Sequence, residues 1–127
     1  MLAEGTFEKK VAIVTGGGSG LGRAMAIELA RLGAGVVVAG RRADALDETI
    51  ALIEDGGGYG HPKPTDVRDP EQVDALVEDA VRRYGRVDVL VNNAAGNFVA
   101  RAEDLSPNGW RAVVGIVLAG GFLCSRA

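Results

Sequence analysis

The feature that most constrains this chain is a glycine-rich stretch between an apolar segment and an amphipathic one. Residues 11–15 (VAIVT) are apolar on both faces, as strands inside parallel sheets are. Residues 15–22 read TGGGSGLG, and the segment that follows repeats apolar residues at helical spacing, through Leu21, Met25, Leu29 and Leu32. A strand, a glycine turn and a helix in this order predict the start of a βαβ unit.

A turn of this kind suits a diphosphate group. The start of a helix offers unpaired backbone N–H groups and the positive end of the helix dipole, and glycine lets the backbone come close to the ligand. The pattern is T-G-x-x-x-G-x-G, since Leu21 and Arg23 stand where G-x-G-x-x-G would have glycine. We predict that a dinucleotide binds at Gly16, Gly18, Ser19, Gly20, Leu21 and Gly22. The alternative is a glycine turn without a ligand.

Strand-like and helix-like segments continue to alternate along the chain. Further strands are expected at 36–39, 59–67 and 87–91, and further helices at 44–53 and 70–84, the latter capped by Asp69. The segment 59–67 is the weakest of these, because Pro62 and Pro64 cannot donate to a sheet ladder. Right-handed crossovers then predict an α/β fold, a Rossmann-like doubly wound parallel sheet with strand order 3-2-1-4.

A last helix is expected to begin at Ser106 and Pro107, a capping residue followed by a first-turn proline. Its inward-facing residues are predicted to be Trp110, Val113, Val114, Val117 and Leu118. Trp110 and Cys124 are interpreted as packing residues of this helix.

A second motif, NNAAG at residues 92–96, follows directly after the strand at 87–91. In a doubly wound sheet, ligands lie across the carboxyl ends of the strands at the switch point, here between the first and fourth strands. Both the glycine turn and the NNAAG segment leave the sheet at that place. A polar turn that only ends a strand is the alternative, but it explains the two motifs together poorly.

Composition narrows the classes of partner. The 127 residues, taken as a single domain, carry 14 basic and 17 acidic side chains, a net charge of −3, and no basic field for nucleic acid or anionic lipid. Residues 1–9 are too polar for a signal peptide, and we expect no apolar run of membrane-spanning length. The single cysteine cannot form an internal disulfide, so a cytoplasmic location is expected. No spacing of Cys, His and carboxylate residues suggests a metal.

The TGGGSGLG turn, Asp66-Val67 and NNAAG, in this order, resemble the short-chain dehydrogenase/reductase family over nearly the whole chain. The resemblance implies a Rossmann fold, a nicotinamide cofactor and hydride transfer to or from a carbonyl, alcohol or activated alkene. It also implies that Asp66 accepts a hydrogen bond from the adenine amine and that Val67 packs on the adenine. The residues expected along the ribose and nicotinamide are Asn92, Ala94 and Gly96.

Three segments, NNAAGNF, LSPNGW and GIVLAGGF, look more narrowly similar to the 2,4-dienoyl-CoA reductases, although other reductases carry similar loops. In that branch the residues matching Arg68, Asn97 and Phe98 lie at an acyl-CoA substrate, and the one matching Asn97 polarises the thioester carbonyl. Asn97 is therefore the one catalytic candidate. Ordinary loop chemistry is the alternative for all three.

The end of the second strand indicates which nicotinamide cofactor is preferred. NAD sites usually place an acidic residue there for the ribose 2′-hydroxyl, whereas this chain has Gly40 followed by Arg41 and Arg42. Guanidinium groups suit the 2′-phosphate, so we predict NADP(H), with Arg41 as the main contact and NAD(H) as the alternative. Two arginines at a helix start also occur as plain solvated charges.

The sequence departs from the family pattern at the residues that carry out catalysis. The family's Tyr-x-x-x-Lys pair has no equivalent here, because the only such spacing, Tyr59 to Lys63, lies on the wrong strand and includes a proline. Ala119 replaces an Asn of the family's last-helix pattern, and Gly115, Gly120 and Gly121 weaken that helix. His61, the only histidine, is expected to be a loop residue. The chain by itself is therefore predicted to be inactive.

Three functions stay open: the cofactor-binding half of an enzyme, a dinucleotide-binding module without turnover, and a structural fragment that binds nothing. The chain lacks the family's C-terminal strands, so the fourth strand should be an unpaired apolar edge that promotes self-association. A homo-oligomer is expected in each case.

Overall fold

The computed structural model describes residues 2–97 and 99–127, and its centre is a four-stranded parallel sheet with the order β3-β2-β1-β4. The strands are β1 Val11–Thr15, β2 Gly35–Gly40, β3 Tyr59–Pro64 and β4 Val89–Val91. The helices are α1 Gly20–Arg31, α2 Ala43–Asp55, α3 Pro70–Tyr84, α4 Pro107–Val114 and α5 Gly120–Arg126, with a short 3-10 helix η1 Ala102–Asp104 and a π-helical segment η2 Gly115–Ala119. The predicted strand order and fold class are confirmed.

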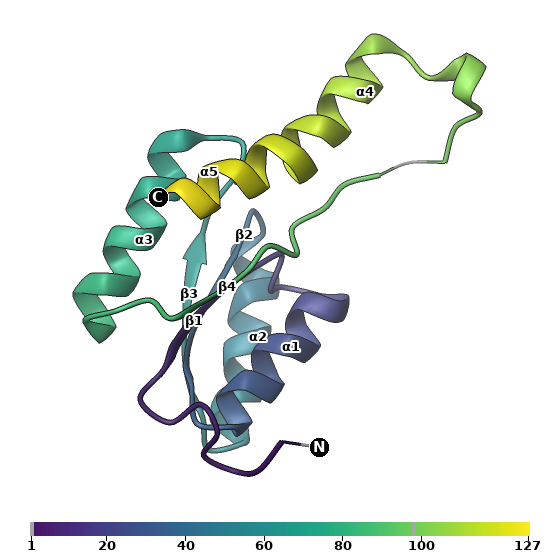
Figure 1. Cartoon of the computed structure of the whole chain (residues 1–127). Coiled ribbons are helices and arrows are strands. Elements are labelled where there is room, and N and C mark those ends of the chain that lie inside the picture. Colours follow the sequence, from purple (N-terminus) through teal and green to yellow (C-terminus); the bar gives the residue numbers. More distant parts are fainter. Residues whose placement is uncertain (1, 98) are drawn as a thin grey trace.

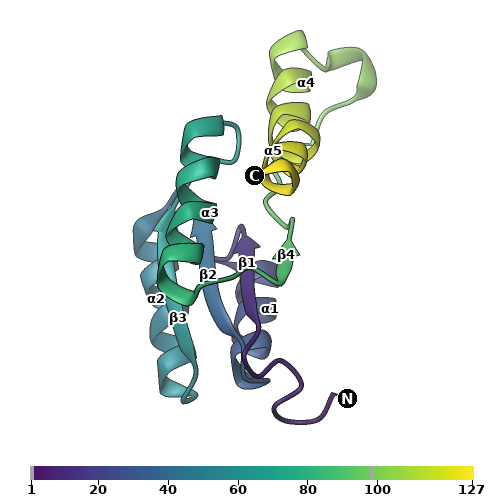
Figure 2. The same cartoon turned by 60° about the vertical axis from the view of Figure 1, so that its left-hand side comes forward.

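Helices cover both faces of the sheet (Figures 1 and 2). Successive residues of a strand point to opposite faces. Accordingly, Val14, Val36 and Val38 pack under α1 and α2, while Ile13, Val37 and Ala39 pack under α3. The predicted α2 residues Leu46, Ile50 and Ile53 are all buried. Every residue of β1 is buried, so the strand that carries the glycine turn is the most completely buried strand of the sheet.

Helix α1 packs largely through small residues, which corrects part of the predicted stripe: Leu29 packs against the core as expected, but Leu21 does not. Its buried residues are Gly22, Ala26 and Ala30, whereas Leu21 is 77% exposed. The close approach of the helix to the sheet favours side chains without bulk, and spacing alone does not distinguish this face from the neighbouring one. Leu32, just past the helix, is buried as expected.

Helix α3 begins as predicted at Asp69, whose carboxylate accepts hydrogen bonds from the N–H groups of Glu71 and Gln72. At the edge of the sheet, β3 accommodates Pro62 and Pro64, because only one side of an edge strand needs donors. His61 lies on this strand and not in a loop, with Nε2 3.2 Å from a carboxylate oxygen of the buried Asp79. Burial lowers the pKa of His61 below its usual value.

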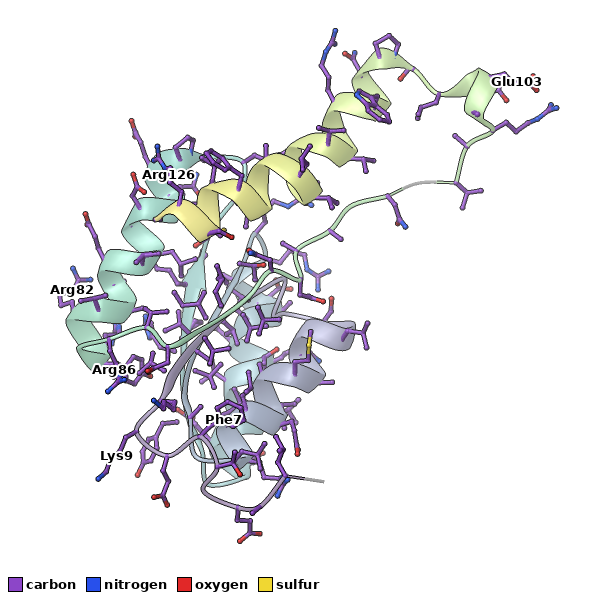
Figure 3. The ribbon with its side chains drawn as sticks, in the orientation of Figure 1. Phe7, Lys9, Arg82, Arg86, Glu103 and Arg126 are labelled. Carbon is purple, nitrogen blue, oxygen red and sulfur yellow. The ribbon has the colours of Figure 1, made fainter. Side chains whose placement is uncertain are left out.

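The last three helical segments form one continuous helix from Pro107 to Arg126, capped by the Ser106 hydroxyl, which accepts from the N–H of Gly109. Its N-terminal half and the segment just before it, residues 101–114, project away from the sheet and are called the projecting arm, with Glu103 at the far end (Figure 3). The C-terminal half lies beside α3, where the Arg126 guanidinium is 4.0 Å from the Asp74 carboxylate.

This packing corrects the predicted inward face of the last helix. Trp110, Val117 and Leu118 are 62%, 51% and 70% exposed, whereas Gly120 and Cys124 are buried. Because the helix has neighbours only from about Gly115 onward, the fully buried residues are those facing α3 and Val67. Cys124 therefore packs as expected and Trp110 does not.

The same helix also corrects the expectation that no apolar run of the chain reaches membrane-spanning length. The 20 residues Pro107–Arg126 contain a window of mean hydropathy 1.2, which is long and apolar enough to cross a membrane by length and composition alone. Core helices of globular proteins pass the same test, so the finding is weak evidence for a membrane segment. Its 11% buried share shows that most of this apolar surface is uncovered within the chain.

Candidate functional site

At the glycine turn, the start of α1 packs so closely against the preceding backbone that a side chain would clash. A side-chain carbon at Gly22 would lie 2.2 Å from the carbonyl oxygen of Gly16, so only glycine fits there. Gly20 has a φ of +51° with open space where a side chain would project, so its backbone conformation, not crowding, favours glycine. Among the described residues, no side chain caps the first turn of α1, and Ser19 leaves its hydroxyl uncommitted to that role. The first N–H groups of the helix are thus available to an anion.

Hydrogen bonds join the glycine turn to the segment after β4. The Thr15 hydroxyl accepts from the N–H groups of Asn93, at 3.1 Å, and Ala94, at 3.0 Å. The Asn93 side-chain amide donates to the carbonyls of Thr15 and Gly16. The two motifs that the sequence placed at one edge of the sheet are therefore in direct contact, and Asn93 acts as the link between them.

A cavity of about 200 Å³ opens beside this junction, above the carboxyl ends of β1 and β2. Eight of the predicted site residues line it: Gly16, Gly18, Ser19, Arg41, Arg42, Asp66, Val67 and Ala94. They come from the glycine turn, the β2–α2 connection, the segment after β3 and the segment after β4. The cavity is thus assembled from the four places that the sequence indicated.

The other predicted residues lie around the cavity or beneath it. Asn92 lines an adjoining smaller cavity, and its amide donates to the Ser125 hydroxyl at 3.0 Å. Gly20, Leu21 and Gly22 belong to the first turn of α1, with Gly22 buried under the turn and Leu21 exposed. Gly96 lies against Ile116. A side-chain carbon at position 96 would come within 2.7 Å of Ile116 Cδ1.

Of the three residues predicted for the substrate, Asn97 is exposed after β4, and Phe98 lies outside the described residues. Arg68 does not line the cavity but folds onto Asp66, with Nε 2.9 Å from one carboxylate oxygen and Nη2 2.5 Å from the other. Hydrogen bonding from Arg68 lowers the pKa of Asp66 to about 2, and the charge of Arg41 acts in the same direction. The carboxylate at the cavity is therefore ionised and available as an acceptor at neutral pH.

Arg41 and Arg42 leave the end of β2, and Arg42 stands at the N-cap position of α2. Both are exposed, and neither forms an ion pair within residues 2–97 and 99–127. A pair of guanidinium groups at the rim of a cavity can fork around a phosphate. The combination of a glycine turn, these cations and the Asp66 acceptor fits a dinucleotide.

Several lining residues were not predicted from the sequence: Gly40, Ala45, Leu46, Thr65 and Ile116. They are apolar or small, so they carry no chemical signal, and only the strand order places them together. Also missed were Arg23 and Thr49, which hold the carbonyls of the glycine turn from behind. No described group of three or more His, Cys, Asp or Glu side chains could hold a metal ion.

Comparison with known proteins agrees with this arrangement. Residues 10–127 match the family described as short chain dehydrogenase. A relative from Bacillus subtilis named "Probable 2,4-dienoyl-CoA reductase" is 49% identical over 120 residues, which are 94% of this chain and 47% of that protein. A "Peroxisomal 2,4-dienoyl-CoA reductase" from Arabidopsis thaliana is 41% identical, over 93% of this chain and 40% of that protein.

Solved structures share the fold. A citronellol catabolism dehydrogenase from Pseudomonas aeruginosa superposes with a TM-score of 0.93 at 40% identity, covering 99% of this chain and 52% of that one. A short chain dehydrogenase from Bacillus anthracis gives 0.90 at 45% identity, covering 95% and 50%. The chain thus spans about half the length of these proteins.

Proposed function

The chain belongs to the short-chain dehydrogenase family, and from that premise we propose that it is the cofactor-binding half of an NADP(H)-dependent reductase. The observation that carries the proposal is the single cavity shared by the glycine turn, Asp66-Val67 and Arg41-Arg42. A bound nicotinamide cofactor would supply the hydride. The residues of this chain would bind and orient it.

Each part of the cavity has a distinct task in this proposal. The N–H groups at the start of α1 hold the diphosphate, as helix N-termini do. The ionised Asp66 accepts from the adenine amine while Val67 packs against the ring. Arg41 and Arg42 bind the 2′-phosphate, and because no carboxylate of the described residues pairs with them, their charge is available to it. This last feature supports NADP(H) over NAD(H).

An enoyl-CoA or dienoyl-CoA is the substrate class that we propose for the whole enzyme. The names of the relatives from Bacillus subtilis and Arabidopsis thaliana support this class for those proteins, and the matching loop of this chain includes Asn97. Asn97 would donate its amide N–H to the thioester carbonyl, and Arg68 would face the same side. We propose that the 127 residues alone bind cofactor without turnover. The only Tyr-x-x-x-Lys spacing of the sequence, Tyr59 to Lys63, cannot serve as the family's catalytic pair, because both residues lie on β3 at the far edge of the sheet.

Calorimetric titration of the R41A/R42A double variant tests the proposal. Losing two charge-assisted hydrogen bonds should weaken NADPH binding about a hundredfold. NADH binding should change less than about threefold, on the order of a surface interaction. The matched control is R101A/R111A, which removes two arginines of the projecting arm, where they pair with Glu103 and Asn108. Equal losses for NADPH and NADH would contradict the assignment of the 2′-phosphate site.

A further inference from the structure

A partly buried set of hydrogen bonds ties the glycine turn to α2 through two side chains, Arg23 and Thr49, that do not themselves line the cavity. Arg23, in the second turn of α1, donates from Nη2 to the carbonyl of Gly18 at 2.6 Å. The same nitrogen donates to the carbonyl of Ala45 at 3.2 Å and to the Glu48 carboxylate at 2.9 Å. One guanidinium therefore touches the glycine turn and the first turns of α2 together.

Thr49 completes this set. It is fully buried in α2, and its hydroxyl accepts from Nε of Arg23 at 3.0 Å. The hydroxyl proton is directed to the carbonyl of Gly17 at 2.9 Å and shared with that of Ala45 at 3.1 Å. Two consecutive carbonyls of the turn, those of Gly17 and Gly18, are thus bound by side chains that lie 5 to 32 residues away in the sequence.

We infer that Arg23 and Thr49 are positioning residues for diphosphate binding, an inference that rests on the proposed function. A peptide unit cannot turn its carbonyl without turning the N–H on its other side, because the peptide bond is planar. Fixing the Gly17 and Gly18 carbonyls toward α2 therefore fixes the N–H groups of Gly18 and Ser19 in the opposite direction. Those two residues line the cavity.

Glycine makes this restraint necessary. A run of glycines has the greatest backbone freedom of any sequence, and holding it in one conformation before the ligand arrives reduces the entropy lost on binding. Arg23 and Thr49 supply that restraint without occupying the cavity. The same network ties the turn to α2, whose N-cap residue Arg42 is a proposed 2′-phosphate contact, so the two phosphate-binding parts are held at a fixed separation.

The test is the T49V variant, which keeps the shape of the side chain and removes the hydroxyl. NADPH affinity should fall about tenfold, the size expected for one lost buried hydrogen bond and its unpaired partner. Adenosine 2′-monophosphate, which lacks the diphosphate, should bind within twofold of its affinity for the unmodified chain. T49S should restore NADPH binding. The E48Q variant is the matched control, because it weakens only the exposed ion pair of Arg23 and should leave both affinities unchanged.

Amide hydrogen exchange without ligand gives a second readout, in which the N–H groups of residues 18–20 should exchange faster in T49V than in T49S. If T49V does not fold, R23M, a change at a partly exposed position, replaces it with the same expectations. Unchanged NADPH affinity in T49V, or equal losses for NADPH and adenosine 2′-monophosphate, would overturn the inference. If the unmodified chain does not bind NADPH, the proposed function is wrong. In that case, unchanged amide exchange in T49V would show that Thr49 does not position the turn either.

Discussion

The sheet with α1, α2 and α3 differs sharply from the helix at Pro107–Arg126. In the first region, helices cover both faces of the sheet and β1 is fully buried. In the second, only 11% of the apolar window is buried, and Trp110 and Leu118 face outward. The first region covers most of its core with its own residues and takes only Ile116, Leu123 and Cys124 from the last helix, whereas the rest of that helix presents an apolar surface that the chain itself does not cover.

This difference separates the two parts of the function. The cavity belongs mostly to the first region, with Ile116 as the one lining residue from the last helix. Cofactor binding should therefore depend on the packed region and be nearly independent of the helix. Association between chains should depend on the helix and on the edge strand β4, because unpaired edges and apolar patches are the surfaces that aggregate.

The largest effect is expected from a methyl group added at Gly22. Because its carbon would overlap the Gly16 carbonyl oxygen, G22A should lower the free energy of unfolding by about 3 kcal/mol, the upper range for an overpacked site. G121A is the matched change in the last helix, where an added side-chain carbon would meet no described atom within 4 Å apart from neighbouring residues of the same helix, and it should raise that free energy by about 0.5–1 kcal/mol. Urea denaturation measures both. Similar effects of the two variants would remove the distinction between the regions.

A smaller effect is expected on self-association. L118K places a charge on the exposed apolar face of the helix and should weaken association by about tenfold, measured by sedimentation equilibrium. Its NADPH affinity should stay within twofold of the unmodified chain. K9Q, an exposed change at the opposite end of the sheet, serves as the control for altered charge. A monomeric unmodified chain would contradict the role assigned to the helix.

The smallest effect concerns acid stability in the packed region. Arg68 holds the pKa of Asp66 at about 2 in the folded chain, compared with 3.8 for the ordinary group. A lowered pKa stabilises the fold above pH 3.8, and this contribution is lost as the pH falls toward 2. The difference in unfolding free energy between the unmodified chain and R68M should therefore be constant above about pH 5 and shrink progressively below it. A difference that does not vary with pH would show that the ion pair is not the cause.

Local patterns were sufficient for most of the packed region. The strand at 11–15, the Asp69 cap and the apolar face of α2 followed from residues close together in the sequence, and the strand order followed from the handedness of the crossovers. The face of α1 was predicted only in part. Leu29 and Leu32 pack as expected, but Gly22, Ala26 and Ala30 bury for closeness and not for hydrophobicity. Arg23 and Thr49 were missed because their contacts join two helices, and an arginine in a helix usually indicates a solvated face.

The last helix could not be predicted in the same way. Its start at Ser106 and Pro107 is a local signal and was found. Which face of this helix is buried depends on the segments that pack beside it, and few residues of the chain pack along Trp110 to Leu118. Periodicity identified apolar residues there but contained no information about which of them a neighbour would cover. The same holds for Asn97, whose proposed role depends on a substrate.

Titration of the isotope-labelled chain with NADPH, followed by amide chemical shifts, tests the central claim most directly. Saturable shifts should gather at residues 16–22, 40–42 and 65–67, with smaller ones at 92–96 and none in the projecting arm. Shifts confined to the surface of the helix at 107–126, or no saturable shifts at any residue, would contradict a dinucleotide site at the glycine turn.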